Sequence, residues 1–239
     1  MSLNIDPRII HDAKKSFFVN GWAVIDPSIL DISEDDSTQI LKIREDNYIK
    51  NKKNAGNFSL KQDSIISCGH FAKLATNLKI YEFIEEVTGR RAFLDCFMHM
   101  LTKGKTPPLG WHRDSYCRNK KFIGPIPQVI KMMIVHTSSS IKDGPFSVVS
   151  GSHALDLGDK YIDKLLPYVF NLKKKVFVSS KRLCVIFDGR ILHKRLNSHF
   201  DGFRSATIIS TLPSCLNKKE LLKDKNKLLA LHMDKRLKV

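Results

Sequence analysis

The sequence predicts a mainly β protein, a jelly roll of two facing sheets with flanking helices, on three observations. In the first third of the chain, apolar residues recur at helical spacing. From Phe93 onward, short apolar runs recur between turn signals instead, which is typical of a β sandwich or barrel. No internal repeat or low-complexity linker divides the chain. Helices followed by strands therefore indicate one β core with a helical buttress.

The helical part is expected to occupy about residues 1–92. Its first helix is predicted over Asp6–Asn20, because Asp6 can cap it, Pro7 suits the first helical position, and Gly21 can end it. The elements predicted after it are a strand at Trp22–Asp26, a helix beginning near Ser33–Asp36, a polar surface segment over Lys50–Asp63, and a helix over Phe71–Thr88 ended by Gly89.

The jelly-roll core is expected to span about residues 93–213. Its predicted strands are Phe93–Leu101, Val129–Thr137, Phe146–Val149, Lys175–Val178, Leu183–Phe187 and Ala206–Leu212. After the core, residues 217–239 combine leucines with eight Lys/Arg and three Asp/Glu. This pattern predicts a basic amphipathic helix that docks on the domain.

Size and composition exclude membrane-spanning and disulfide-rich secreted proteins. The 239 residues fit a single domain over residues 1–239. No apolar run approaches the roughly 20 residues needed to cross a bilayer, and the first residues lack the layout of a signal peptide. The five cysteines are scattered without a Cys-x-x-Cys pair, which is typical of reduced thiols inside cells. We therefore expect a cytoplasmic protein.

The net charge of +16 is large. Nucleic acid, an anionic membrane surface, or a substrate bearing phosphate or carboxylate would all be attracted by it. A Lys-rich solvated surface explains the charge equally well, because the charge is dispersed along the chain. The charge alone therefore leaves the partner open.

A candidate metal site comes from His-x-acid pairs, of which the chain has three: His112/Asp114, His199/Asp201 and His232/Asp234. In a strand, residues two apart share a face, as chelation of one ion requires, whereas in a helix they diverge. His232/Asp234 lies in the predicted C-terminal helix, and His199/Asp201 lies in a polar turn. His112/Asp114 enters an extended segment after a Pro-rich loop, and it is the pair that we favour.

A third ligand is expected at the end of another strand, and His193 directly follows the run Leu183–Leu192. Two histidines and one carboxylate with open positions form the usual donor set of non-haem Fe(II) oxygenases. Taken singly, each histidine is better explained as an ordinary hydrogen-bonded core or surface residue.

Arg204 strengthens the metal hypothesis. If the chain turns widely across Arg195–Gly202, His193 and Arg204 are predicted to face each other on adjacent antiparallel strands, with Cβ atoms roughly 5 Å apart. A tight hairpin at Asp201-Gly202 would place them about 20 Å apart. An Arg on the strand next to His193 can hold a carboxylate with two parallel hydrogen bonds. A dicarboxylate co-substrate needs such a partner for the carboxylate that does not bind the metal.

The chain resembles the phytanoyl-CoA dioxygenase family of Fe(II)- and 2-oxoglutarate-dependent oxygenases. The likeness spans most of the chain, and the order and spacing of its segments are more specific than any one motif. The segments that carry it are Asn20–Ile25, Trp111–Asp114, Asp143–His153 and the His193…Asn197…Arg204 spacing.

The resemblance implies a double-stranded β-helix, a jelly roll of cupin type, with Fe(II), 2-oxoglutarate and O2 as cofactor and co-substrates. It implies that His112, Asp114 and His193 bind the metal and are the catalytic residues, and that Arg204 holds the distal carboxylate of 2-oxoglutarate. Lys103 is a weaker co-substrate candidate. Ser150 and Asp143 replace the usual Pro and Asn, but they lie in a structural part of the signature.

The implied reaction oxidises a C–H bond, usually by hydroxylation, while 2-oxoglutarate becomes succinate and CO2. The carboxylate of Asp114 favours oxygen transfer, because related halogenases lack it. Basic residues in two segments suggest a small organic substrate with a phosphate or carboxylate: Arg113, Arg118, Lys120 and Lys121 after the metal motif, and Lys50, Lys52, Lys53 and Lys61 before it.

Two alternatives stay open. One is an oxygenase that acts on nucleic acid, with the basic charge tracking phosphates. The related demethylases carry a second Arg on the last strand, and Ser205–Leu212 has none, so we expect no nucleic-acid partner. The other is a β-sandwich binding module without enzymatic activity, in which the metal-binding pattern is accidental.

Overall fold

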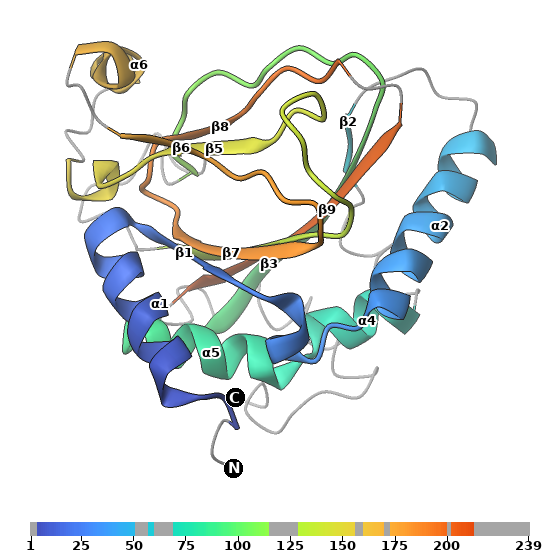
Figure 1. Cartoon of the computed structure of the whole chain (residues 1–239), viewed down its shortest axis with the longest axis horizontal. Coiled ribbons are helices and arrows are strands. Elements are labelled where there is room, and N and C mark those ends of the chain that lie inside the picture. Colours follow the sequence, from blue (N-terminus) through green and yellow to red (C-terminus); the bar gives the residue numbers. More distant parts are fainter. Residues whose placement is uncertain are drawn as a thin grey trace, which may run out of the picture.

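The computed structural model describes residues 4–50, 57–59, 69–114, 129–155, 160–169, 173–199 and 202–212. In these residues two β sheets face each other, and helices cover the outer face of the larger sheet (Figure 1). The larger sheet has six strands in the order β1-β7-β4-β9-β3-β2, and the smaller has three in the order β6-β5-β8. The prediction of a jelly roll with flanking helices is confirmed.

The strands are β1 (Trp22–Ile25), β2 (Asn57–Ser59), β3 (Phe93–Lys103), β4 (Ile130–Val135), β5 (Phe146–Val149), β6 (Lys174–Val176), β7 (Leu183–Asp188), β8 (His193–Arg195) and β9 (Phe203–Leu212). The helices are α1 (Pro7–Asn20), α2 (Glu34–Lys50), α4 (Gly69–Ala75), α5 (Leu78–Thr88) and α6 (Lys160–Val169), with short 3-10 turns η1 (Pro27–Leu30) and η3 (Ser152–Ala154). The predicted strands were found within a few residues of their positions. Strands β2 and β8 were not predicted, and β2 lies within the segment Lys50–Asp63, which was expected to be only a polar surface stretch.

Helix α1 forms as its sequence predicts. The Asp6 carboxylate accepts a hydrogen bond from the backbone N–H of Arg8, and Pro7 opens the helix. Gly21 ends it with φ +83°, a left-handed conformation that glycine adopts without strain. A side chain at this position would also collide with the imidazole of His153.

The helix predicted over Phe71–Thr88 is wrong in one respect, because the chain forms two helices there. Helix α4 ends at Ala75, and Asn77 caps α5 by accepting a hydrogen bond from the backbone N–H of Lys79. The Asn77 amide also donates to the carbonyl of Leu30. Apolar periodicity continues across this break, so periodicity alone does not reveal it. The predicted C-terminal helix lies outside the described residues.

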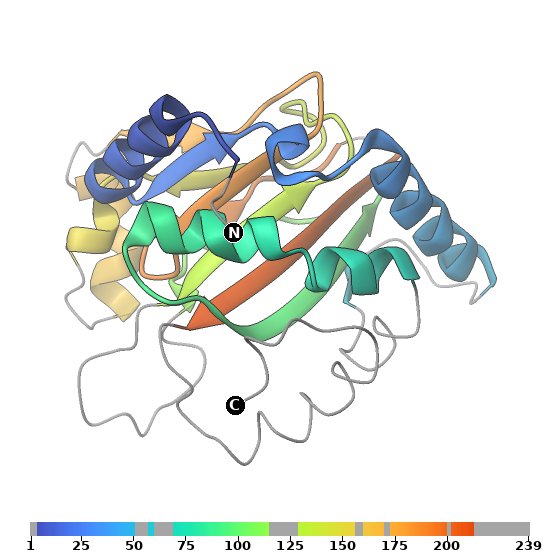
Figure 2. The ribbon, with the colours of Figure 1, turned by 90° about the horizontal axis from the view of Figure 1, so that it is seen from below.

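Apolar side chains fill two layers. One lies between the larger sheet and the helices, and it contains Phe17, Phe83 and Ile209. The other lies between the two sheets, and it contains Phe146 and Phe187. Figure 2 shows α4 and α5 crossing the outer face of the larger sheet. The space between the sheets is therefore lined mainly by apolar side chains of the facing strands.

A network of buried, hydrogen-bonded polar side chains lies between the larger sheet and the helices. His136 follows β4, and its two ring nitrogens lie 3.0 Å from the Ser37 hydroxyl and 2.8 Å from the Thr207 hydroxyl. Thr207 in turn lies 2.9 Å from Nδ1 of His99 on β3. Burial lowers the pKa of His136 to about 3, with Arg182 adding to the effect, and lowers the pKa of His99 well below its ordinary value. Both imidazoles are therefore neutral in the folded protein at neutral pH.

We expect the buried histidines of this network to make the protein less stable in acid. Between pH 3 and 6.5 the unfolded state binds a proton at His136 that the folded state does not. Stability is thus complete above about pH 6.5 and falls as the pH is lowered, by about 2 kcal/mol at pH 5 from His136 alone. Urea unfolding from pH 5 to 8 measures the slope. His136→Gln should flatten it, whereas His11→Gln on the exposed face of α1 should not. Equal slopes for His136→Gln and the wild type would contradict the assignment.

Candidate metal centre

The segment that carries His112 and Asp114 lies along the free edge of β8. His112 and His193 exchange two backbone hydrogen bonds, each with a donor–acceptor distance of 3.0 Å. The backbone N–H of Asp114 donates to the carbonyl of Gly189, also at 3.0 Å. Main-chain bonds alone therefore bring the candidate ligands side by side from positions far apart in the sequence.

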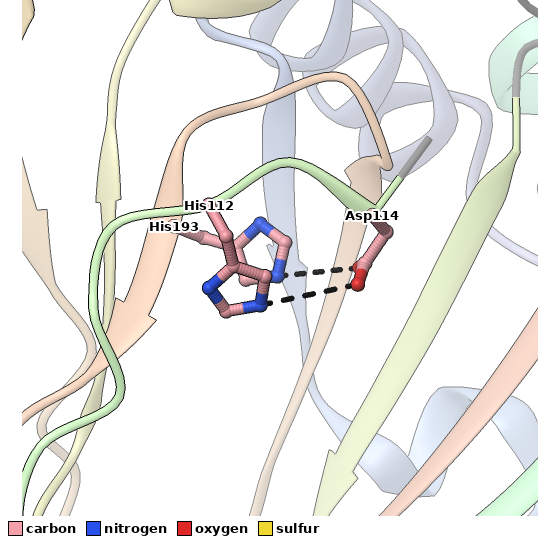
Figure 3. Close-up of side chains that lie close together, drawn as sticks. All are labelled: His112, Asp114 and His193. Atoms are coloured by element: carbon pink, nitrogen blue, oxygen red, sulfur yellow. Dashed lines mark ion pairs between the residues drawn. The ribbon is translucent and has the colours of Figure 1, made fainter. Parts of the chain in front are cut away.

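The three side chains converge as predicted (Figure 3). The ring centroids of His112 and His193 lie 4.3 Å apart. One oxygen of Asp114 lies 3.2 Å from Nε2 of His193, and the other lies 3.9 Å from Nε2 of His112. One donor atom from each residue falls within 4.8 Å of the others. Among the described residues, this is the group whose composition and spacing fit a single metal ion.

Each imidazole is oriented by a backbone carbonyl. Nδ1 of His112 lies 2.8 Å from the carbonyl oxygen of Gly110, and Nδ1 of His193 lies 2.9 Å from that of Ile191. Because a carbonyl only accepts, each Nδ1 carries the proton. Each Nε2 faces Asp114 and is the ring nitrogen through which a metal would be bound once it carries no proton.

Electrostatics keep the group in its metal-binding protonation state. Burial lowers the pKa of His112, and the neighbouring His193 lowers it further. Burial alone would raise the pKa of the Asp114 carboxyl, but His193 and Lys131 outweigh it and hold the pKa well below its ordinary range. The site therefore offers a neutral His112 imidazole and a carboxylate at neutral pH, the forms that bind metal.

The predicted pairing of His193 with Arg204 on adjacent strands is wrong. Strand β8 pairs with β5 in the smaller sheet, whereas β9 pairs with β3 and β4 in the larger. The link between β8 and β9 crosses from one sheet to the other, so the two residues belong to opposite walls of the sandwich.

Arg204 itself is buried in that interior. It shares a face of β9 with Ala206 and Ile208, which belong to the apolar layer between the sheets. The residue is 4% exposed, and its Nε has no hydrogen-bond partner among the described residues. Burial lowers the pKa of Arg204 to about 10, with Arg195 adding to the effect, so the guanidinium stays charged. A buried cation with an unused donor fits the carboxylate of a bound molecule.

Lys103 does not fit its predicted co-substrate role. It pairs with Phe203, whereas Thr102 pairs with Arg204. Successive residues of a strand point to opposite faces, and the Lys103 ammonium lies 5.0 Å from the ring centroids of both Tyr48 and Phe203. Lys103 thus faces helix α2, outside the sandwich. The buried Thr102 is the neighbour of Arg204 on the interior face.

Arg113, between the two candidate ligands of the His-x-Asp motif, does not have the role that the sequence suggested. Rather than facing an anionic substrate, it is 1% exposed and has structural partners. Nε donates to the Asp163 carboxylate of α6 at 2.8 Å, and Nη2 donates to the Leu155 carbonyl at 3.1 Å. Nη1 donates to the carbonyls of Ser152 and Arg190. Arg113 ties the metal segment to three other parts of the fold.

Lys131 is a site residue that the sequence analysis missed. It lies on β4 facing the interior, 8% exposed, with Nζ 2.6 Å from an oxygen of Asp114. A signal was available, because Lys131 interrupts the otherwise apolar run Val129–Val135, and a lysine within a buried strand requires a partner.

Several predicted features lie outside the described residues. They are Asp201 of the second His-x-acid pair, the whole of the third pair, and the basic residues Lys52, Lys53, Lys61, Arg118, Lys120 and Lys121. No described helix is both long enough and apolar enough to cross a bilayer.

Comparison with known proteins agrees with this architecture. The sequence profile of the phytanoyl-CoA dioxygenase (PhyH) family matches residues 44–204. The search of curated proteins found no match. Among solved structures, the α-ketoglutarate-dependent epimerase SnoN from nogalamycin biosynthesis is 14% identical with a TM-score of 0.69, covering 87% of this chain and 82% of that chain. AviO1 from Streptomyces viridochromogenes is 14% identical with a TM-score of 0.67, covering 89% and 96%.

EctD from S. alaskensis, solved with 2-oxoglutarate and 5-hydroxyectoine, is 15% identical with a TM-score of 0.64, covering 89% of this chain and 82% of that chain. At these identities the structures establish the shared fold, while the family profile covers most of the sequence. The chain therefore belongs to the phytanoyl-CoA dioxygenase family, a family of non-haem iron oxygenases that use 2-oxoglutarate.

Proposed function

We propose that this chain hydroxylates a small organic substrate in an Fe(II)- and 2-oxoglutarate-dependent reaction that releases succinate and CO2. The observation that carries the proposal is the convergence of His112, Asp114 and His193 in a sandwich whose interior also contains the buried Arg204. Two imidazoles and one carboxylate leave open positions on a six-coordinate metal. A five-carbon diacid can occupy two of them and extend its far carboxylate to Arg204.

Each residue has a defined task in this proposal. His112 and His193 donate through Nε2, and Asp114 donates through one carboxylate oxygen, so together they hold Fe(II). The guanidinium of Arg204 binds the distal carboxylate of 2-oxoglutarate by a charge-assisted bond. The bound iron supplies O2 activation and oxidation of a substrate C–H bond, and the protein supplies position and a dry pocket.

The interior supports chemistry that must exclude water. The rings of Phe146 and Phe187 lie 5.5 Å and 5.4 Å from the ring of His193, between centroids. Both phenylalanines are buried. Apolar walls of this kind strengthen the electrostatic contacts made within them. Hydroxylation is proposed in preference to halogenation because Asp114 supplies a third protein ligand.

The proposal predicts that Arg204 controls 2-oxoglutarate affinity. In Arg204→Lys a single ammonium replaces the planar fork, so 2-oxoglutarate should bind to the Mn(II)-loaded protein about 10- to 100-fold more weakly. Calorimetric titration measures this affinity, and succinate formation with Fe(II) measures turnover. Lys103→Met is the matched control, because Lys103 faces helix α2. It should bind 2-oxoglutarate like the wild type.

Two results would count against the proposal. Wild-type protein that forms no succinate with Fe(II) and 2-oxoglutarate, and binds no 2-oxoglutarate, would favour a binding module without enzymatic activity. Unchanged affinity in Arg204→Lys together with a loss in Lys103→Met would place the co-substrate on the other face of β3.

A further inference from the structure

Lys131 is a buried cation beside the metal centre to which the proposed chemistry gives no task. Along β4 it shares a face with Met133 and Val135, which belong to the apolar layer between the sheets. Its side chain is 10% exposed, and its ammonium lies 2.6 Å from the Asp114 carboxylate. Lysine is almost never buried in apolar surroundings unless it is paired. Its place in the interior therefore needs an explanation in terms of what it binds.

The co-substrate does not provide that explanation. Lys131 pairs with Ser210 on β9, and Arg204 lies on the same face of β9 six residues earlier. At about 3.3 Å per residue, the two positions are roughly 20 Å apart along the strand. A five-carbon diacid that joins the metal to Arg204 extends away from Lys131. The lysine therefore approaches the metal from the end of the interior that 2-oxoglutarate leaves free.

Charge balance indicates what belongs at that end. With Fe(II) and 2-oxoglutarate bound, the interior would hold four positive charges: two on the metal, one on Arg204 and one on Lys131. It would hold three negative charges: one on Asp114 and two on 2-oxoglutarate. Arg195 and Asp143, which shift the pKa of Arg204 in opposite directions, offset each other. One positive charge remains in excess, and an uncompensated buried charge is strongly unfavourable.

Among the described residues, the acidic partner of Lys131 is Asp114. Once Asp114 is a metal ligand, its negative charge is shared with a dication that repels the ammonium. The sequence that follows Asp114, residues 115–128, has three basic residues and no acidic one. The missing negative charge must therefore come with a bound molecule.

We propose that Lys131 binds an anionic group, a carboxylate or a phosphate, of the organic substrate and so places a neighbouring carbon at the iron. This rests on the proposed function, since it assigns the substrate end of the same site. The anionic substrate is then inferred from the buried ammonium of Lys131 and not from Arg113, whose partners are structural. Lys131 is in this view a specificity-determining residue.

The test uses Mn(II)-loaded protein saturated with 2-oxoglutarate, because Mn(II) permits binding measurements without turnover. Butyrate and inorganic phosphate are titrated separately by calorimetry, with butyramide as the uncharged counterpart of butyrate. We expect one of the two anions, and not butyramide, to bind the wild type, and the anion that binds identifies the group. Lys131→Met keeps the length of the side chain without its charge, so it should weaken that binding about tenfold or more.

Controls separate recognition from general effects. Lys194→Met removes the same charge from the outer face of β8, where the ammonium lies 4.7 Å from the centroid of the Trp111 ring. It should bind the anion like the wild type. Lys131→Met should retain Mn(II) and 2-oxoglutarate binding, and Lys131→Gln repeats the test if the Met variant is unstable.

Each remaining outcome overturns the proposal. Anion binding that is equal in the wild type and Lys131→Met would place the anion elsewhere, for example on the metal itself. No binding of either anion to the wild type would also overturn it. Loss of Mn(II) binding in Lys131→Met would reduce the lysine to a positioning residue for Asp114. If the wild type binds neither Mn(II) nor 2-oxoglutarate, the proposed function fails first and this inference fails with it.

Discussion

Asp114→Ala should abolish turnover and lower Mn(II) affinity by more than about 100-fold. Loss of a residue that only supports a metal ligand costs up to about 100-fold in affinity, and loss of a ligand itself should cost more. The carboxylate is the one anionic donor of the group. Its loss would also leave the Lys131 ammonium, 2.6 Å away, without its partner. Two imidazoles beside an uncompensated lysine would then have to attract a dication. Electron paramagnetic resonance of free Mn(II) measures the affinity directly.

Asp26→Asn is the matched control for this substitution. Asp26 is a carboxylate that caps η1 through the backbone N–H of Ser28, away from the metal centre. It should lose a small amount of stability and no metal affinity. Retention of Mn(II) affinity by Asp114→Ala would show that the metal is held elsewhere.

Arg113→Met should destabilise the protein by about 3–5 kcal/mol, the usual cost of removing one partner from a buried ion pair. The side chains of Arg113 and Asp163 are 0% and 4% exposed, so water cannot replace the lost partner. Carbonyls of Ser152 and Leu155 lose their donor as well. Because Arg113 lies between two candidate metal ligands, Mn(II) affinity should fall with stability. Urea unfolding at neutral pH measures the change.

A double substitution isolates the cause. Arg113→Met combined with Asp163→Leu removes both charges, and it should recover part of the lost stability. Arg182→Met, which removes an Arg bonded to the carbonyls of Ile32 and Ser33 on the helix side, should leave Mn(II) affinity unchanged. A loss below about 1 kcal/mol in Arg113→Met would contradict the structural role of this buried pair.

The sequence predicted the convergence of His112, Asp114 and His193 better than the surroundings of these residues, for a physical reason. His112 and Asp114 two apart on extended backbone, and His193 after an apolar run, are local patterns. Which sheet receives β9 is not local, because it depends on how the link from β8 crosses the sandwich. The predicted contact of His193 with Arg204 was wrong for this reason, although both residues face the same interior.

Arg113 and Lys103 illustrate a second limit. A basic residue looks the same in sequence whether it is solvated or buried against a carboxylate, so Arg113 was assigned to the substrate rather than to Asp163. Lys103 and Thr102 differ by one position, and only the register of β3 with β9 shows which one faces inward. Lys131 could have been found, since its burial followed from the apolar residues on both sides.

The reciprocal main-chain bonds between His112 and His193 have a consequence for iron loading. They join peptide groups and not imidazoles, so they persist whether or not an ion is present. Small zinc domains unfold when stripped of their metal, but here a jelly roll already holds the donors in place. Iron lost to oxidation or a chelator can therefore be restored to an intact enzyme, without a cycle of refolding.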